Sequence, residues 1–520
     1  MQSQLIEILG TEGLNTEAQH RQLFSQDVFR EGEVAEYIAR PSSVEQLQAV
    51  VKLAAENGYA LVPRGGAMSY TDGIVPAAER TVVIDMGALS RVLDINTEDM
   101  NVTVEAGCTW LDLHEALKPT GLCTPYRGTL SGIKATVGGS LSQNSIFWGS
   151  GQYGTAADNV IGMEVVTADG SLLVTGSASR RNSSAFTRHF GPDLTGLFTS
   201  DCSALGIKAR ITLPLVPERE HKRFVSASFG SFADMQNCMS AVARSELASE
   251  CFGFDPYLQA QRMRRESLAK DVKALTGVMK SAGGIGKALK EGARVALAGR
   301  NFIDEEDWSV HYIVEDHSEA GAEVRESRML ELIRANNGKV VENTIPKVLN
   351  AHPFGPVNNM VGPDGERWVP VHALVPHSKA QQAYKITEEV FAKHRDAIEK
   401  HNIGVGYLLA VVSTSVFVLE PVFFWPDELK ALHRDSVEPA HLKKLKGFPE
   451  NLEARGAVTT IRKELQEAYL ELGTSHLQLG KSYPYQETLR PESRALITAL
   501  KTTLDPQGIM NPGVLGFKGE

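Results

Sequence analysis

The sequence predicts an α+β fold built from two parts, and three observations lead to this prediction. Up to about Val216, short apolar strands alternate with glycine-containing turns. From about 217 to 470, long helical stretches alternate with strands, which indicates a second α+β unit. The 520 residues are also too many for one hydrophobic core. Two or three domains are therefore expected.

Local patterns predict the elements of the first part in order. Residues 1–40 are expected to mix helix and coil, and Ser43 then caps an amphipathic run that predicts a helix. The apolar residues that share one face of this helix are Val44, Leu47, Val50, Val51 and Ala54. Short apolar runs predict strands at 59–63, 81–84 and 101–104. Asp169-Gly170 between two alternating apolar stretches predicts a hairpin over 162–174.

Composition excludes several classes of protein. The 63 Asp and Glu residues exceed the 53 Lys and Arg residues, and a net charge of −10 argues against a general nucleic-acid binder. Five cysteines without a CxxC pair indicate reduced thiols rather than a zinc or redox site. No signal peptide is recognisable, and the apolar run from Ile403 to Leu419 is shorter than a bilayer span. A soluble, cytoplasmic protein without a transmembrane segment is expected.

One stretch of the second part has an unusual composition. Lys270 to Arg300 is rich in Gly, Ala, Lys and Arg. We interpret it as a solvated segment because its glycines weaken a helix. A membrane-surface or partner-binding helix is the alternative.

Three glycine-containing stretches are the candidates for chemistry. The first, VPRGGAMSYTDG, follows a strand, and its paired glycines let backbone N–H groups turn toward an anion. In this interpretation Arg64 supplies a counter-charge and Ser69 a hydroxyl. The second stretch runs from Thr129 to Gly154, and the third from Leu504 to Gly513. An ordinary turn is the alternative for each one alone.

Together these stretches resemble the FAD-linked oxidases of the vanillyl-alcohol oxidase and p-cresol methylhydroxylase (PCMH) type, over nearly the whole chain. The resemblance implies FAD as the cofactor and a PCMH-type two-subdomain FAD-binding fold with an α+β cap. The implied parts are an N-terminal helical segment at 1–40, the FAD-binding domain at 41–216, the cap at 217–469 and a segment at 470–520 that completes the flavin site. The residues that it places at FAD are Pro63, Arg64, Gly65, Gly66, Ala67, Met68, Ser69, Tyr70, Leu130, Thr136, Gly138, Gly139, Ser142, Tyr153, Gly154, Ile207 and Asn511.

The resemblance also implies oxidation of an alcohol or an activated alkyl C–H on an aromatic or phenolic small molecule. Lys481, Tyr483 and Tyr485 occupy the place where the phenol-oxidising branch binds phenolate, and they offer a cation and hydroxyl donors. A surface lysine with two packed tyrosines is an equally good interpretation. His372 and His476 are candidates for a general base, a flavin anchor or a substrate contact. We predict no metal site.

Some positions depart from the family pattern. Met68 stands where relatives with histidyl-linked FAD carry histidine, and His372 lies only near the place of a flavin-linked cap histidine. Non-covalent FAD is therefore favoured. The acidic residue that this branch carries before the glycine pair is absent from 131–136.

Two other functions stay open at this point. One is a D-2-hydroxy-acid dehydrogenase, for which Arg367 is the cap candidate for the substrate carboxylate. The other is a non-catalytic flavin-binding or partner-binding protein. The expected electron acceptor is oxygen, a cytochrome or a quinone. For the oligomeric state, a homodimer is the hypothesis.

Overall fold

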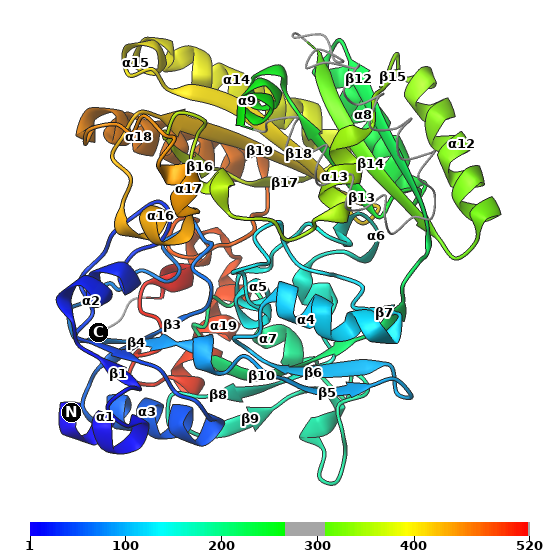
Figure 1. The fold of residues 1–520 in the computed structure, drawn as a ribbon. Coiled ribbons are helices and arrows are strands. Elements are labelled where there is room, and N and C mark those ends of the chain that lie inside the picture. Colours follow the sequence, from blue (N-terminus) through cyan, green and yellow to red (C-terminus); the bar gives the residue numbers. More distant parts are fainter. Residues whose placement is uncertain (266–306, 518–520) are drawn as a thin grey trace.

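The computed structural model describes residues 1–265 and 307–517, and the stretch from Lys270 to Arg300 lies outside the described residues. Two halves pack against each other (Figure 1). The lower half in this view holds two small sheets and a short strand pair, and the upper half holds one eight-stranded sheet. Each half has its own hydrophobic core, as the α+β prediction requires. Within the described ranges, no helix combines the length and apolar composition that crossing a bilayer requires.

The first sheet of the lower half is mostly parallel. In spatial order its strands are β1 (Leu14–Asn15), β2 (Tyr37–Ala39), β4 (Thr81–Asp85) and β3 (Ala60–Arg64). The C-terminal chain extends this sheet, because the Leu61 backbone N–H donates to Ile509 O at 2.8 Å and accepts the Asn511 N–H through its carbonyl at 2.8 Å. The first 40 residues were expected to be helix and coil, but β1 and β2 bring them into the sheet. These strands are only two and three residues long, too short for a periodicity to reveal.

The second sheet is antiparallel and contains the predicted hairpin. Its strands, in spatial order, are β5 (Val92–Asn96), β6 (Asn101–Glu105), β10 (Ile207–Pro214), β8 (Gly162–Val166) and β9 (Leu172–Val174). The pairing of β8 with β9 confirms the hairpin around Asp169-Gly170. A separate short pair is formed by β7 (Leu122–Cys123) and β11 (Val216–Pro217).

Helices complete the lower half. Among them is the predicted helix after Ser43, whose hydroxyl accepts from the Gln46 N–H at 3.2 Å. The helices are α1 (Gln2–Leu9), α2 (Ala18–Phe24), α3 (Val44–Glu56), α4 (Trp110–Leu117), α5 (Val137–Gln143), α6 (Ser150–Tyr153), α7 (Leu194–Leu197) and α19 (Pro491–Leu504).

The upper half is built on one antiparallel sheet, here called the cap sheet. In spatial order its strands are β15 (Lys339–Val341), β12 (His221–Phe229), β14 (Trp308–Asp316), β13 (Glu250–Phe254), β18 (Gly404–Val412), β19 (Val416–Trp425) and β16 (Arg367–Pro370), and β17 (Ala373–Pro376) also pairs with β19. The apolar run from Ile403 to Leu419, which is shorter than a bilayer span, supplies β18 and the first part of β19.

Helices cover one face of the cap sheet, and the other face turns toward the lower half (Figure 1). The covering helices are α8 (Phe232–Arg244), α12 (Glu319–Ala335), α14 (Ala380–Lys393) and α18 (Leu452–Leu472), whose apolar residues share the upper core. The remaining helices of the upper half are α9 (Pro256–Arg265), α13 (Thr344–Ala351), α15 (Arg395–Lys400), α16 (Ala431–Ser436) and α17 (Pro439–Leu442).

A buried ion cluster joins the two halves. Arg127 of the lower half lies 3.4 Å from Glu250 of β13 and 3.2 Å from Glu315 of β14. The Gly149 N–H also donates to Glu250, at 2.5 Å. Burial raises the pKa of Glu250 to about 8, and the charge of Arg127 opposes this shift. The cluster therefore depends on the arginine to hold two buried carboxylates together.

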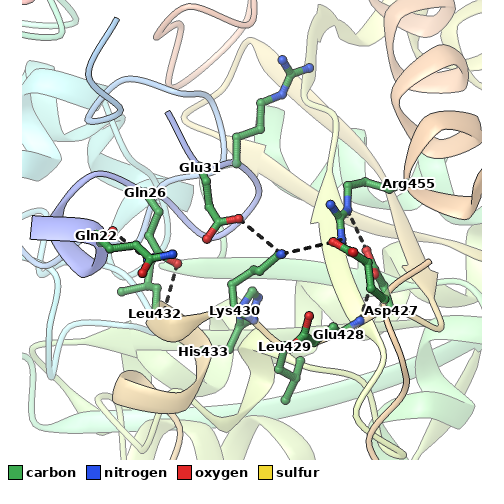
Figure 2. Close-up of polar contacts among 12 residues, drawn as sticks. Gln22, Gln26, Glu31, Asp427, Glu428, Leu429, Lys430, Leu432, His433 and Arg455 are labelled. Atoms are coloured by element: carbon green, nitrogen blue, oxygen red, sulfur yellow. Dashed lines mark hydrogen bonds and ion pairs between the residues drawn. The ribbon is translucent and has the colours of Figure 1, made fainter. Parts of the chain in front are cut away.

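The N-terminal segment makes a second connection between the halves (Figure 2). The amide oxygen of Gln26 accepts the Leu432 backbone N–H at 3.1 Å. Lys430 lies 3.3 Å from Glu31 and 3.6 Å from Glu450. The segment thus lies against the start of α16, close to the loop that follows β3.

Candidate functional site

A cavity of about 250 Å³ lies between the two halves. Its lower wall is formed by the loop after β3 and by the chain around α5. Its upper wall is formed by the cap sheet and α9. Two glycine-containing stretches that the sequence analysis singled out therefore meet at one cavity.

The loop after β3 borders the cavity. Residues 63–70 all line it, and Ala67 has a left-handed φ of 59°. Within the described part of the chain, no hydrogen-bond acceptor engages the backbone N–H groups of residues 66–70. Unpartnered amides at a turn form a nest for an anion, so this loop fits the pyrophosphate of a dinucleotide.

Arg64 lines the cavity but turns its guanidinium elsewhere. Its Nη1 donates to Gln26 O at 2.8 Å, and the group lies over the Phe24 ring at 4.7 Å. Burial lowers the pKa of Arg64 to about 10. The side chain expected to supply a counter-charge to a phosphate thus anchors the N-terminal segment to the loop.

The chain around α5 forms the rest of the lower wall. Thr136 caps the helix by accepting the Gly139 N–H at 3.2 Å. Gly138 packs so closely on Ala106 that a Cβ would lie 2.7 Å from the alanine methyl. The absence of a side chain at Gly138 therefore allows α5 to pack closely against the chain at Ala106. The predicted cofactor residues of this region that line the cavity are Leu130, Thr136, Gly138, Gly139, Ser142 and Ile207.

Three residues expected at FAD lie outside the lining among the described residues. The Tyr153 ring packs beneath Arg219 at 5.7 Å, and Gly154 ends α6 with a φ of 84°. The amide of Asn511 donates to Gly73 O at 2.8 Å and to Cys202 O at 2.7 Å. Asn511 therefore holds together two segments that border the cavity.

A histidine and a carboxyl group face the cavity from the cap sheet. His372 lies between β16 and β17, which both pair with β19, so it comes opposite Glu420 of that strand. The His372 Nε2 lies 3.6 Å from the Glu420 carboxyl. Both residues line the cavity, and both are more than nine-tenths buried.

Two residues predicted as catalytic hold His372 in place. The Tyr483 hydroxyl accepts the His372 backbone N–H at 2.8 Å and lies 3.4 Å from its Nδ1. The His476 Nδ1 donates to the His372 carbonyl at 2.6 Å, and its ring stacks on Tyr483 at 4.2 Å. Tyr483 and His476 thus form a layer behind His372.

Burial favours the neutral forms of four side chains, those of His372, His476, Tyr483 and Glu420. It lowers the pKa of His372 to about 3 and that of His476 to about 4, and it raises the pKa of Tyr483 to about 12. It also raises the pKa of Glu420 to about 8, against the attraction of Arg262. At neutral pH the Glu420 carboxyl group is therefore mostly protonated and His372 is neutral.

The other predicted site residues lie away from the cavity. The Lys481 ammonium donates to Val75 O, and burial lowers its pKa to about 8. Tyr485 packs on a separate cluster around Val514. Lys481, Tyr483 and Tyr485 do not converge on one point, because Gly480, with a φ of 54°, begins a turn that sends them in different directions.

Arg367 and His377 also face other partners. The Arg367 guanidinium is buried beside Asp427 at 3.4 Å and donates to the Phe29 carbonyl. It does not line the cavity, so the structure does not support it as a carboxylate-binding residue. His377 contacts Ser240 at 2.8 Å, apart from His372. Among the described residues, no group of three His, Cys, Asp or Glu side chains is arranged for a metal ion.

Sequence reasoning missed three charged residues of this region. Glu420 lies in the apolar strand β19, and Arg262 lines the cavity from α9. Arg462 of α18 is 3% exposed, and its Nε and Nη2 atoms have no hydrogen-bond partner among the described residues. Burial lowers the pKa of Arg462, and the nearby Tyr483 opposes this shift. The sequence feature that could have revealed Glu420 is a single carboxylate inside an otherwise apolar strand.

Replacing Gly66 by alanine is expected to weaken FAD binding at least about tenfold, because the loop must shift. A Cβ on Gly66 would lie 1.9 Å from the carbonyl oxygen of Lys134. The measurement is a titration of the apoprotein with FAD. The control is Gly456→Ala, since a Cβ there meets no atom within 4 Å. Equal FAD affinity in G66A and the wild type would show that the loop does not hold the cofactor.

Comparisons with known proteins agree with this geometry. Residues 35–176 match the family model described as FAD binding domain, and residues 479–515 match the FAD linked oxidases, C-terminal domain. The first match covers the loop after β3 and α5, and the second covers the chain that extends the first sheet. FAD is the cofactor that both models indicate.

Curated relatives match less than half of the chain. A glycolate oxidase subunit of Bacillus subtilis is 27% identical over 230 residues, which is 44% of this chain and 47% of the relative. A mitochondrial D-lactate dehydrogenase (cytochrome) of Arabidopsis thaliana is 31% identical over 224 residues, which is 42% of this chain and 38% of the relative. The chain thus spans less than half the length of each of these relatives.

A solved structure matches the whole fold. The structure of p-cresol methylhydroxylase with substrate bound aligns with a TM-score of 0.74 at 16% identity, over 99% of this chain and 96% of that one. At this identity the likeness concerns the fold. The chain therefore carries an FAD binding domain at residues 35–176 and a match to the C-terminal domain of FAD linked oxidases at residues 479–515, on a fold like that of p-cresol methylhydroxylase.

Proposed function

We propose that this protein is an FAD-dependent oxidoreductase that removes hydride from an alcohol or an activated alkyl C–H of a small aromatic or phenolic molecule. The observation that carries the proposal is the buried pair of Glu420 and His372, which opens into the cavity shared with the FAD loop. Aromatic side chains are among the other residues that line this cavity. They are Phe147, Phe252, Trp368 and Phe424.

The cavity suits a flat apolar ring with one hydroxyl group. Aromatic walls favour a ring through stacked and edge-to-face contacts and exclude water from it. The residues proposed to hold FAD are those of the loop 63–70 and the lining residues around α5. Bound FAD supplies the two-electron acceptor for such an oxidation.

Glu420 and His372 are proposed to manage the proton that the substrate loses. In its ionised form the Glu420 carboxylate accepts the substrate hydroxyl proton as the carbon is oxidised. The His372 Nε2 lies 3.6 Å from that carboxyl group and is proposed to stabilise its ionised form. Tyr483 and His476 keep His372 in position through its backbone N–H and carbonyl.

The proposal is tested by steady-state turnover of the FAD-loaded protein with an artificial electron acceptor. The panel contains 4-alkylphenols, benzylic alcohols and D-2-hydroxy acids. We expect the highest kcat/KM for a member of the aromatic classes. Turnover of D-2-hydroxy acids alone would overturn the aromatic proposal, and a protein that binds FAD but oxidises no class would support a non-catalytic role. The same assay with oxygen, cytochrome c or a quinone in place of the artificial acceptor identifies the class of natural electron acceptor.

The second candidate function is a D-2-hydroxy-acid dehydrogenase, and the position of Arg262 favours it. Arg262 lines the cavity close enough to Glu420 to lower its pKa, and a guanidinium binds carboxylates well. Two curated relatives are named as glycolate or D-lactate enzymes. If this function holds, Arg262→Met will raise KM for the hydroxy acid about tenfold or more, whereas KM for an uncharged benzylic alcohol will change little.

A further inference from the structure

An arginine- and phenylalanine-containing loop on the lower half has no role in the proposed chemistry. Residues 180–190 read RRNSSAFTRHF, with three arginines, two phenylalanines and no acidic residue. The whole chain carries 63 acidic residues and a net charge of −10. This loop is therefore a basic, aromatic stretch on an acidic protein.

The loop exposes large apolar side chains to solvent. Phe186 is 61% exposed, Phe190 is 54% exposed and the following Leu194 is 41% exposed. Three exposed large apolar side chains within nine residues form a local patch, which we call the 186–194 patch. Exposed apolar side chains that cluster in this way mark a surface for interaction.

Hydrogen bonds hold the loop in this exposed conformation. The Ser177 hydroxyl oxygen accepts the backbone N–H groups of Phe186 at 3.0 Å and Thr187 at 3.2 Å. Arg188 donates to Ala157 O at 2.6 Å and pairs with Asp193 at 2.8 Å. The two phenylalanines are thus exposed in a conformation that hydrogen bonds stabilise.

Two arginines next to the patch keep their charge available. Arg180 and Arg181 are exposed, and neither forms an ion pair with any described residue. The loop follows β9 and lies at the lower edge of Figure 1, on the opposite side of the molecule from the cap sheet. A flat partner can therefore reach it without contact with the upper half.

We propose that residues 180–194 dock this protein reversibly on an anionic lipid surface. Phe186 and Phe190 enter the headgroup region, where aromatic rings are favoured, and Arg180 and Arg181 pair with lipid phosphates. An anionic membrane repels the rest of this acidic protein. The protein is therefore expected to bind with residues 180–194 facing the membrane. Two rings and two charges suffice for reversible binding and not for permanent anchoring.

The experiment is flotation of the full-length, FAD-loaded protein with two kinds of vesicle, phosphatidylcholine alone and an equal mixture with phosphatidylglycerol. We expect binding to the mixed vesicles that weakens as salt is added. In F186S/F190S the bound-to-free ratio is expected to fall about tenfold or more, because the apolar contribution is lost. R180Q/R181Q is expected to bind weakly and without salt dependence.

The matched control is V324S/L496S, which removes two other exposed apolar side chains, 69% and 66% exposed, and is expected to float like the wild type. Flavin absorbance and turnover are measured for each variant to confirm that it is folded. Equal flotation of F186S/F190S and the wild type, or no flotation of the wild type, would overturn the proposal. If the wild type does not float but self-associates through these phenylalanines, the loop is a protein contact and the proposal is wrong.

Discussion

Replacing Glu420 by glutamine is expected to lower kcat of substrate oxidation about 10²- to 10⁴-fold, the usual contribution of a general base. The amide keeps the shape of the carboxyl group and its place beside His372 Nε2, but it takes up no proton. FAD remains bound, since Glu420 belongs to the cap sheet and not to the loop after β3. Single-turnover and steady-state rates of E420Q and the wild type measure the effect.

The pH profile gives a second readout of the same residue. Burial raises the pKa of Glu420 to about 8, so the carboxyl is mostly protonated at neutral pH and accepts no proton in that form. In the wild type, kcat/KM is therefore expected to rise as the pH increases through about 8 and then to level off. E420Q should lose this rise, and Glu420→Asp should restore part of it.

A control separates this effect from a general change in charge. Glu389 on α14 has a side chain that is 63% exposed and lies away from the cavity, so Glu389→Gln is expected to leave kcat and the pH profile unchanged. If kcat of E420Q stays within about threefold of the wild type, Glu420 is not the base.

Replacing Arg127 by methionine is expected to destabilise the protein by about 3–5 kcal/mol, as measured by the free energy of unfolding in urea. The change leaves Glu250 and Glu315 buried near each other without their shared cation, although Lys222 at 3.3 Å still faces Glu315. The two halves meet at this cluster, so FAD should be released earlier in the unfolding transition.

The double variant R127M/E250Q tests the cause of this loss. Glutamine removes one buried charge, so the double variant is expected to be more stable than R127M alone. Arg328 on α12 forms an exposed pair with Glu331, and Arg328→Met is expected to cost less than about 1 kcal/mol. A loss in R127M no larger than that in R328M would mean that the cluster does not hold the halves together.

The sequence predicted local elements of the cofactor half well. The hairpin around Asp169-Gly170 and the helix after Ser43 depend on turn and cap chemistry within a few residues, so short patterns are enough to find them. The loop after β3 was likewise visible as paired glycines after a strand. The strand β2 was not predicted, because its place depends on pairing with β4 rather than on its own three residues.

The chemistry of the cap was harder to predict, because it depends on register across the cap sheet. His372 stood out as a histidine, but its partner Glu420 lies 48 positions further along in a strand that is otherwise apolar. Only the pairing of β16 and β17 with β19 brings the two together. In contrast, Lys481 and Tyr485 are neighbours of Tyr483 in sequence and face other parts of the molecule.

The most direct measurement is an anaerobic mixing experiment with the FAD-loaded protein and a 4-alkylphenol or benzylic alcohol. We expect the yellow flavin colour to disappear in a single turnover in the wild type and to persist on the same timescale in E420Q, with equal FAD content in both. Persistence of the colour in the wild type with every aromatic substrate, or loss of colour in E420Q at the rate of the wild type, would contradict the assignment of this cavity and its Glu420–His372 pair.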